Sequence, residues 1–160
     1  MNLYLKQLLQ DKTIPVIFDY DGTLFEARWF ERRINMPNET EEKLRAAHKR
    51  GECLITKPIT MVIDMVQRIN SPIFVLSHIH SSEEYDFKCS QLKKYYTNIN
   101  LSNLFYATSI EDKINYLERI LNSYQSFIYI DDNHQALIKF ENHFNDDEHC
   151  HFFHASSLFV

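Results

Sequence analysis

A chain of 160 residues with 44% hydrophobic and 14% aromatic content can bury one full core and is too short for two ordinary domains. Its net charge of -5 argues against a general nucleic-acid binder, whose binding surface is usually basic. The three cysteines, Cys53, Cys89 and Cys150, lie far apart and form no C-x-x-C pair, which argues against a disulfide framework or a zinc knuckle.

The N-terminal stretch MNLYLKQLLQDK indicates a first helix and has no property of a targeting segment. It lacks the basic start, the long apolar core and the small-residue cleavage site of a signal peptide. No apolar run farther along the chain approaches the length of a membrane span. We therefore expect a cytoplasmic protein with no membrane contact.

Five short apolar runs are typical of buried strands. They are rich in β-branched and aromatic residues and do not alternate with polar ones, which indicates a parallel sheet covered on both faces. The runs cover residues 14–18 (IPVIF), 72–76 (PIFVL), 104–108 (LFYAT), 126–130 (SFIYI) and 150–155 (CHFFHA).

Helical patterns alternate with these strands, over residues 59–70, 82–96, 109–121 and 133–144. The second begins with a serine cap at Ser82, the third has Ser109 and Asp112 in capping-box positions, and the fourth starts at Asn133. The alternation predicts an α/β fold: a three-layer α/β/α sandwich around a mainly parallel, five-stranded, Rossmann-like sheet. Ligands of such sheets bind at the carboxyl ends of the strands.

Residues 26–57 interrupt this alternation after the first strand. Within them, residues 38–51 indicate one polar helix that ends at Gly51, with too few apolar residues for a core of its own. The segment holds eight cations and six acids, in contrast to the acidic remainder. We expect one domain over residues 1–160, with 26–57 as a small helical insert or minimal cap over the sheet.

The string DYDGTL follows the first predicted strand directly. Asp19 falls at the carboxyl end of this strand, Asp21 points to the same side, and Gly22 permits a sharp turn. Such a pair of carboxylates binds a divalent cation, or one attacks while the other moves protons. An Asp-Gly pair alone is most often only a turn.

The longer string resembles the first motif of the haloacid dehalogenase-like superfamily, a strand followed by D-x-D-G-T. The weaker motifs of that family occur in the same order: Ser77 ends IFVLS, Lys113 lies near the start of the helix predicted over 109–121, and Asp131 and Asp132 follow FIYI. The resemblance spans residues 14 to about 155, apart from the insert. Ala136 stands where the family often has a further acid.

The resemblance implies a Mg²⁺-dependent phosphomonoester hydrolase. Asp19 would attack phosphorus and form an aspartyl-phosphate, and Asp21 would protonate the leaving group and then activate water. Ser77 would bind the phosphoryl group, and Lys113 would neutralise its oxygens and hold the nucleophile. Two alternatives remain: a non-catalytic protein of this fold that binds a phosphorylated ligand or regulates a partner, and a phosphotransferase.

The resemblance also implies the Mg²⁺ ligands and the substrate class. Asp19, Asp131 and Asp132 would hold the ion, and Asp21 would add a backbone carbonyl. An open site would admit a phosphorylated macromolecule, with nucleic acid only as a substrate; a covered site would select a small phosphorylated molecule.

Five residues are candidates for substrate contact: Thr23, His78, Arg28, Arg32 and Arg33. By contrast, Lys88, Lys93 and Lys94 are expected to be solvated. The late string HCHFFH suggests zinc, but neighbouring strand residues face opposite ways, so its ligands should not converge.

Overall fold

The computed structural model describes residues 1–26, 57–145 and 147–159. The insert expected over 26–57 lies outside the described residues except for Glu26 and Lys57, and its helix over 38–51 lies wholly outside them. Among the described residues, no helix is both long enough and apolar enough to cross a membrane.

Five parallel strands form one sheet in the order β3-β2-β1-β4-β5. Their bounds are β1 Val16–Phe18, β2 Ile73–His78, β3 Leu104–Ala107, β4 Phe127–Asp131 and β5 Cys150–His154. The five-stranded parallel sheet that the apolar runs predict is therefore confirmed. Strand β1 is central, with β2 on one side and β4 on the other, so the ends of these three strands are adjacent.

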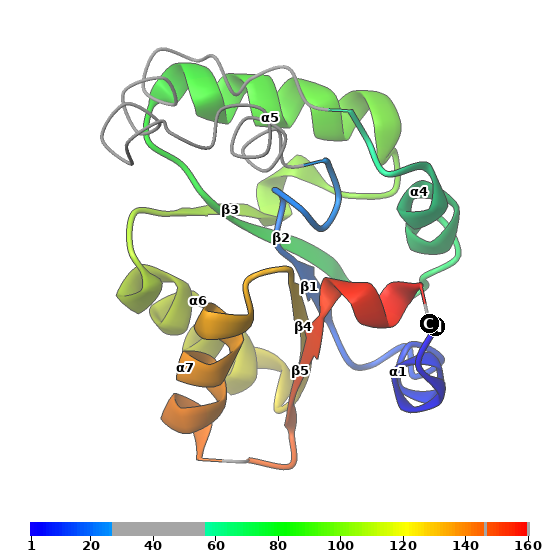
Figure 1. The fold of residues 1–160 in the computed structure, drawn as a ribbon, viewed down its shortest axis with the longest axis vertical. Helices are drawn as coiled ribbons and strands as arrows, with labels where there is room; N and C mark the ends of the chain where they lie inside the picture. Colours follow the sequence, from blue (N-terminus) through cyan, green and yellow to red (C-terminus); the bar gives the residue numbers. More distant parts are fainter. Residues whose placement is uncertain (27–56, 146, 160) are drawn as a thin grey trace, which may run out of the picture.

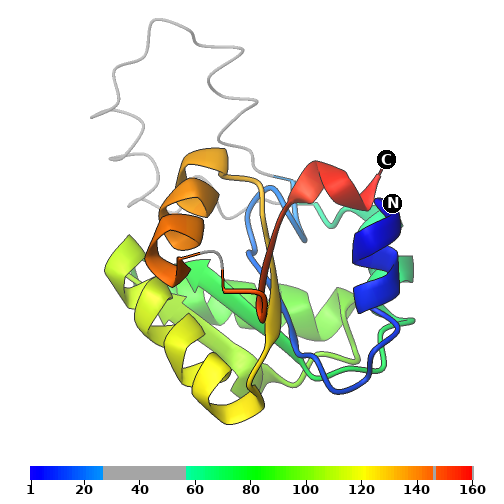
Figure 2. The ribbon, with the colours of Figure 1, turned by 90° about the horizontal axis from the view of Figure 1, so that it is seen from below.

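Helices cover both faces of the sheet (Figures 1 and 2). One face is covered by α1 Leu3–Leu8, α4 Thr60–Val66, α5 Ser82–Tyr95 and the 3₁₀ helix η2 Ala155–Leu158. The other is covered by α6 Ile110–Tyr124 and α7 His134–Phe144, and the short 3₁₀ helix η1 Leu101–Asn103 leads into β3. The three-layer α/β/α sandwich is thus confirmed.

Successive side chains of a strand point to opposite faces of the sheet, which explains why there are two separate core layers. Val16 and Phe18 of β1 pack into the layer with α4 and α5, whereas Ile17 packs into the layer with α6 and α7. All three side chains are fully buried, as expected for a strand covered on both faces. The same alternation decides which layer each polar residue beyond a strand end can meet.

The helix starts agree with the sequence patterns, with one shift. Ser109 and Asn133 cap α6 and α7, accepting hydrogen bonds from the backbone N–H groups of Asp112 and Ala136. The cap of α5 is Ser81 rather than Ser82, since the Ser81 hydroxyl accepts from the N–H of Glu84. Either serine fits the local pattern; the backbone of Ser81 is the one that is extended.

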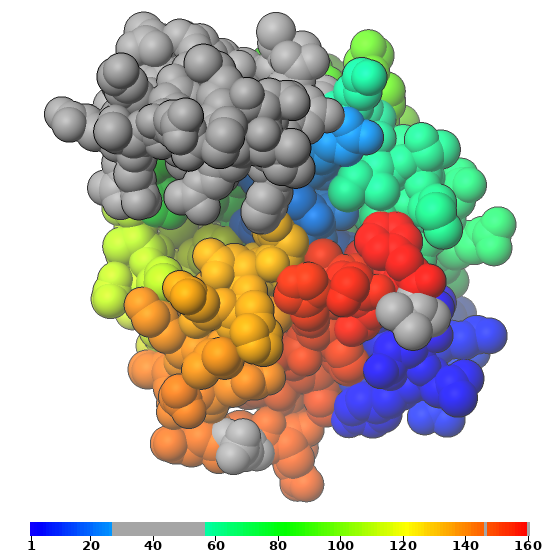
Figure 3. Space-filling model, viewed as in Figure 1, coloured from blue at the N-terminus to red at the C-terminus, as the bar shows by residue number. Residues whose placement is uncertain are grey.

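The two ends of the chain meet on the α1 side of the molecule. The Asn2 N–H donates to the Ser157 carbonyl at 2.9 Å, and the ring of Tyr4 lies edge-on to that of His151. Figure 3 shows the N-terminal residues (blue) against the C-terminal ones (red) on this face. Helix α1 is therefore a packed part of the layer.

Candidate active site

Three adjacent strands bring polar side chains to one edge of the sheet. Asp19 directly follows β1, Ser77 lies near the end of β2, and Asp131 is the last residue of β4. Because parallel strands end at the same edge, these residues meet although they are far apart in the sequence. These residues are the candidate for the ligand site that the sequence predicts at this edge.

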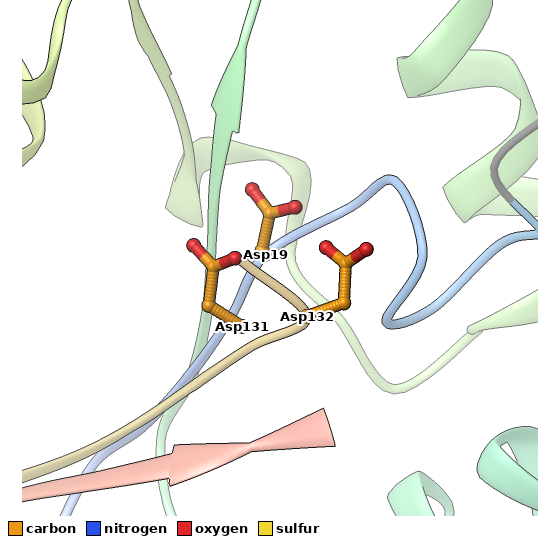
Figure 4. Close-up of side chains that lie close together, drawn as sticks. All are labelled: Asp19, Asp131 and Asp132. Carbon is orange, nitrogen blue, oxygen red and sulfur yellow. The ribbon is translucent and has the colours of Figure 1, made fainter. Parts of the chain in front are cut away.

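The carboxylates of Asp19, Asp131 and Asp132 form a cluster. One oxygen atom from each lies within 4.8 Å of the others, and Figure 4 shows the three groups gathered around one space. Burial, together with the charges of Asp131 and Asp21, raises the pKa of Asp19 to about 7 against the opposing effect of Lys113. Burial and the neighbouring Asp131 likewise raise the pKa of Asp132 to about 6.

This cluster fits a hard divalent cation such as Mg²⁺. Its ligand atoms are all carboxylate oxygens, which Mg²⁺ prefers. Burial, and after it the neighbouring carboxylates, raise the pKa of Asp19 and Asp132, and a bound cation would stabilise their charged forms. Both oxygens of Asp131 already accept hydrogen bonds: Oδ1 from the Asn133 N–H at 2.8 Å, and Oδ2 from Tyr129 and Lys113.

Lys113 reaches the edge of the sheet and contacts three buried polar groups there. Its ammonium group donates to Asp19 Oδ1 at 2.8 Å, to the Tyr129 hydroxyl at 3.1 Å and to Asp131 Oδ2 at 3.1 Å. Burial opposes the charge, yet Asp19 and then Tyr129 and Asp131 raise the pKa of Lys113 well above its ordinary value. All three N–H donors are used, so Lys113 holds Asp19 in one position.

Tyr129 is a member of this network that sequence reasoning missed. Its hydroxyl donates to Asp131 Oδ2 at 2.6 Å, and its side chain is fully buried. Burial and the negative charge around it raise the pKa of Tyr129 well above its ordinary value. The signal was present: Tyr129 precedes Asp131 by two residues in a strand, so both point to the same face, and a buried tyrosine needs a partner for its hydroxyl.

Asp21 does not join the carboxylate cluster. Its side chain is 39% exposed, and its Oδ2 accepts from Lys88 Nζ at 2.7 Å. The sequence predicts that Asp19 and Asp21 face one point. In the structure they pair with different lysines, Asp19 with Lys113 and Asp21 with Lys88. The predicted Mg²⁺ ligand at Asp21, a backbone carbonyl, stays a prediction.

Lys88 corrects the expectation that the lysines of α5 are solvated. It is 3% exposed and contacts Asp21, Ser77 Oγ at 2.8 Å, the His78 carbonyl at 3.0 Å and Glu84 Oε1 at 2.9 Å. Burial opposes its charge, but Asp21 and Glu84 raise the pKa of Lys88 above its ordinary value.

The helical spacing of α5 contains the signal for this burial. Lys88 follows Tyr85 by three residues and precedes Leu92 by four, so it falls within the apolar stripe, whereas Lys93 and Lys94 lie outside it and are exposed.

Gly22 has φ +77°, in the left-handed region that favours glycine, and it lies at the sharp turn that the sequence predicts. A β-carbon added here would overlap the carboxylate of Asp132. Gly22 therefore allows the turn and leaves space for the Asp132 carboxylate. Only the turn can be predicted from the sequence.

The remaining candidates for substrate contact differ in what surrounds them. Thr23 is fully buried, and its hydroxyl has no hydrogen-bond partner in the described part of the chain, so it is available to a ligand. His78 is half-buried, and burial, with the charges of His80, Lys113 and Lys88, lowers its pKa to about 4. Arg28, Arg32 and Arg33 lie outside the described residues.

The late histidines do not assemble into a metal site within the described residues, where the only such cluster is the three aspartates. His154 has a structural contact instead. Its Nδ1 accepts from the Ser156 N–H, so Nε2 carries the proton that it donates to the Asp132 carbonyl at 2.9 Å.

No family model and no curated protein matches the sequence. Among solved structures, a similar chain comes from Burkholderia xenovorans and is described as a haloacid dehalogenase-like hydrolase. It has 13% identity and a TM-score of 0.54, over 92% of this chain and 85% of that one. A second is the HAD domain of the effector protein Lem4 from Legionella pneumophila, with 15% identity and a TM-score of 0.47 over 88% and 85% of the two chains.

The first of these similarities shows that the chain has the fold of haloacid dehalogenase-like hydrolases. The fold that the D-x-D-G-T resemblance implies is therefore confirmed.

Proposed function

We propose that this chain is a haloacid dehalogenase-type hydrolase, and more specifically a Mg²⁺-dependent phosphomonoester hydrolase that acts through an aspartyl-phosphate. The observation that carries the proposal is the buried contact of Asp19 Oδ1 with Lys113 Nζ at 2.8 Å, beside the carboxylates of Asp131 and Asp132. A nucleophilic carboxylate needs this kind of environment, in which it is held in place and a cation can enter.

The first step forms a bond between a carboxylate oxygen of Asp19 and phosphorus. Lys113 holds Oδ1, which leaves Oδ2 for the attack. As the bond from phosphorus to the ester oxygen breaks, the leaving oxygen takes a proton from the carboxyl group of Asp21. The enzyme is then an aspartyl-phosphate at residue 19, with Asp21 ionised.

The second step hydrolyses this intermediate. Asp21 takes a proton from a water molecule, whose oxygen bonds to phosphorus while the bond from phosphorus to Asp19 breaks. Inorganic phosphate leaves, Asp19 is again a carboxylate and Asp21 is again protonated, so both groups are ready for the next turnover.

Mg²⁺ bound by Asp19, Asp131 and Asp132 would supply positive charge to the phosphoryl oxygens. The Ser77 hydroxyl, and the Thr23 hydroxyl that has no partner, would donate to the same oxygens. Such fixed donors contribute most when they are arranged before the substrate arrives. The burial of both residues supports this part of the proposal.

The substrate would be a phosphorylated small molecule or, if the site is open, a phosphorylated macromolecule. Phosphate release separates hydrolysis from a binding-only function and from transfer to another acceptor. A suitable panel holds an aryl phosphate, nucleotides, sugar phosphates and an oligonucleotide with a 3′-phosphate, each with and without Mg²⁺.

We predict that Asp19→Asn abolishes phosphate release while the fold survives, because an amide cannot attack phosphorus. The matched control is Asp86→Asn, the same chemical change at an exposed position of α5, which should leave the rate unchanged. Mg²⁺-dependent release that is lost only in Asp19→Asn is the expected result. Retained activity in Asp19→Asn, or no release by folded wild-type protein from any panel member, would contradict the proposal.

A further inference from the structure

Lys88 is a buried cation that the proposed mechanism leaves without a function. It lies on α5, is 3% exposed, and directs its ammonium group at Asp21, Ser77, the His78 carbonyl and Glu84. A lysine is almost never buried to this degree unless its charge is paired. One of these partners neutralises its charge, and the others are groups that Lys88 holds in place.

Glu84 already neutralises Lys88 from within α5. It precedes Lys88 by one turn, and its side chain is 6% exposed. Its Oε1 lies 2.9 Å from Lys88 Nζ, and its Oε2 accepts from the His80 N–H at 2.8 Å. Because this buried pair is anchored at both carboxylate oxygens, Lys88 does not need Asp21 as its counter-ion.

The contact with Lys88 restricts the side-chain rotamers of Asp21. Asp21 lies in the loop after β1 and is 39% exposed, so several side-chain rotamers would otherwise be open to it. Lys88 binds Oδ2 at 2.7 Å and leaves Oδ1 for exchanging a proton. A general acid–base group works only within hydrogen-bond reach of the oxygen that it serves, so fixing the rotamer favours the reaction.

Ser77 is held by the same nitrogen atom. Its Oγ accepts from Lys88 at 2.8 Å, so its own proton must go to another acceptor. That acceptor is the His78 carbonyl at a long 3.3 Å. A charged phosphoryl oxygen would be a stronger acceptor and could replace it.

We propose that Lys88 is a positioning residue that holds the Asp21 carboxylate and the Ser77 hydroxyl at a fixed separation for phosphoryl transfer, and that Glu84 holds Lys88 in place. The inference rests on the proposed function, since it concerns the acid–base group of that reaction. Lys88 does not touch the reacting atoms; it acts through Asp21 and Ser77.

The test compares leaving groups. In Lys88→Met, kcat/KM reports formation of the aspartyl-phosphate. It should fall about 10²-fold for phenyl phosphate, whose leaving oxygen needs a proton, and less than about tenfold for dinitrophenyl phosphate, which needs none. The matched control is Lys93→Met, an exposed lysine of the same helix, and it should change neither value.

A double-mutant cycle with Asp21→Asn separates positioning from a general effect on the site. If Lys88 acts through Asp21 and Ser77, adding Lys88→Met to Asp21→Asn should lower kcat/KM for phenyl phosphate only by the part that acts through Ser77, less than about tenfold. Equal losses for the two substrates, or a full loss added to that of Asp21→Asn, would overturn the inference. If Lys88→Met does not fold, Lys88→Met/Glu84→Gln removes both buried charges and replaces it.

Crystal structures give a readout that does not depend on turnover. Asp21 should occupy one rotamer in the wild type and a different one, or several, in the Lys88 variant; an unmoved Asp21 would overturn the inference. If the wild type releases no phosphate, the proposed function fails on that result, whereas the rotamer of Asp21 still decides whether Lys88 positions it.

Discussion

Gly22 shows how much one residue can determine in this site. Its φ of +77° would strain any other residue, by roughly 1–3 kcal/mol. The overlap that a β-carbon would have with Asp132 adds a second constraint from a segment more than a hundred residues away. The first constraint acts within the turn, and the second exists only because β1 and β4 are neighbours.

We predict that Gly22→Ala lowers the affinity for Mg²⁺ at least about tenfold, because the added carbon displaces Asp132, and lowers the free energy of unfolding by roughly 1–3 kcal/mol. Isothermal titration and urea unfolding measure the two effects. Gln125→Gly is the control, since it relieves a φ of +64° at the far end of α6 and should leave Mg²⁺ affinity unchanged. Wild-type affinity in Gly22→Ala would contradict the geometry described for the turn.

At the scale of an element, α6 is the clearest link between local sequence and the site. The Ser109 hydroxyl accepts from the Asp112 N–H, and Asp112 in turn accepts from both the N–H and the hydroxyl of Thr108. These bonds begin the helix at the carboxyl edge of the sheet. Lys113 then falls in the first turn, where it reaches Asp19.

We predict that Ser109→Ala lowers the free energy of unfolding by about 1 kcal/mol, because the Asp112 N–H loses its partner at the start of the helix. Urea unfolding measures the change. The control is Ser123→Ala in the last turn of α6, where the hydroxyl only bonds back to the Arg119 carbonyl and its removal should cost less than about 0.5 kcal/mol. Equal losses in the two variants would show that the cap contributes nothing of its own.

At the scale of the whole molecule, each of the two helical layers contributes one lysine that contacts an aspartate just after β1. Lys113 comes from α6 and pairs with Asp19, and Lys88 comes from α5, on the other face, and pairs with Asp21. The proposed nucleophile and the proposed acid–base group therefore have separate cations. A sheet covered on both faces makes this division possible, since each layer approaches the strand ends from its own side.

The carboxylate cluster couples the stability of the whole molecule to pH and Mg²⁺. Burial raises the pKa of Asp19 and Asp132 from 3.8 to about 7 and about 6. The folded chain therefore binds these two protons more tightly than the unfolded chain does, so this contribution to stability declines as the pH rises from about 4 to about 7. Mg²⁺ competes with the same protons.

We predict that saturating Mg²⁺ raises the melting temperature by about 5–10 °C near pH 8 and by much less near pH 5, where protons occupy Asp19 and Asp132. Scanning calorimetry at the two pH values measures the difference. Asp132→Asn should reduce the gain near pH 8. A gain of the same size at both pH values would contradict the assignment of these carboxylates as the site of binding.

The sequence by itself determined the parallel sheet, the positions of its strands, the turn at Gly22 and the set Asp19, Ser77, Lys113 and Asp131 with Asp132. The sheet, its strands and the turn follow from local signals: apolar runs, caps and a glycine at a turn. The set of polar residues follows from the resemblance of DYDGTL and of the weaker strings after it to the haloacid dehalogenase-like motifs. Because parallel strands end at one edge, the order of the motifs was enough to predict that they meet.

Only the tertiary structure decided which partners these residues take. That Asp21 pairs with Lys88, that Tyr129 bonds Asp131, and that Gly22 makes room for Asp132 all depend on the order of the strands and on the face that each helix covers. The charge of a lysine gives no sign of burial, since burial is set by the partners that the fold brings within reach. Its residue type therefore predicts that Lys88 lies on the surface, whereas the buried carboxylate of Glu84 makes its burial possible.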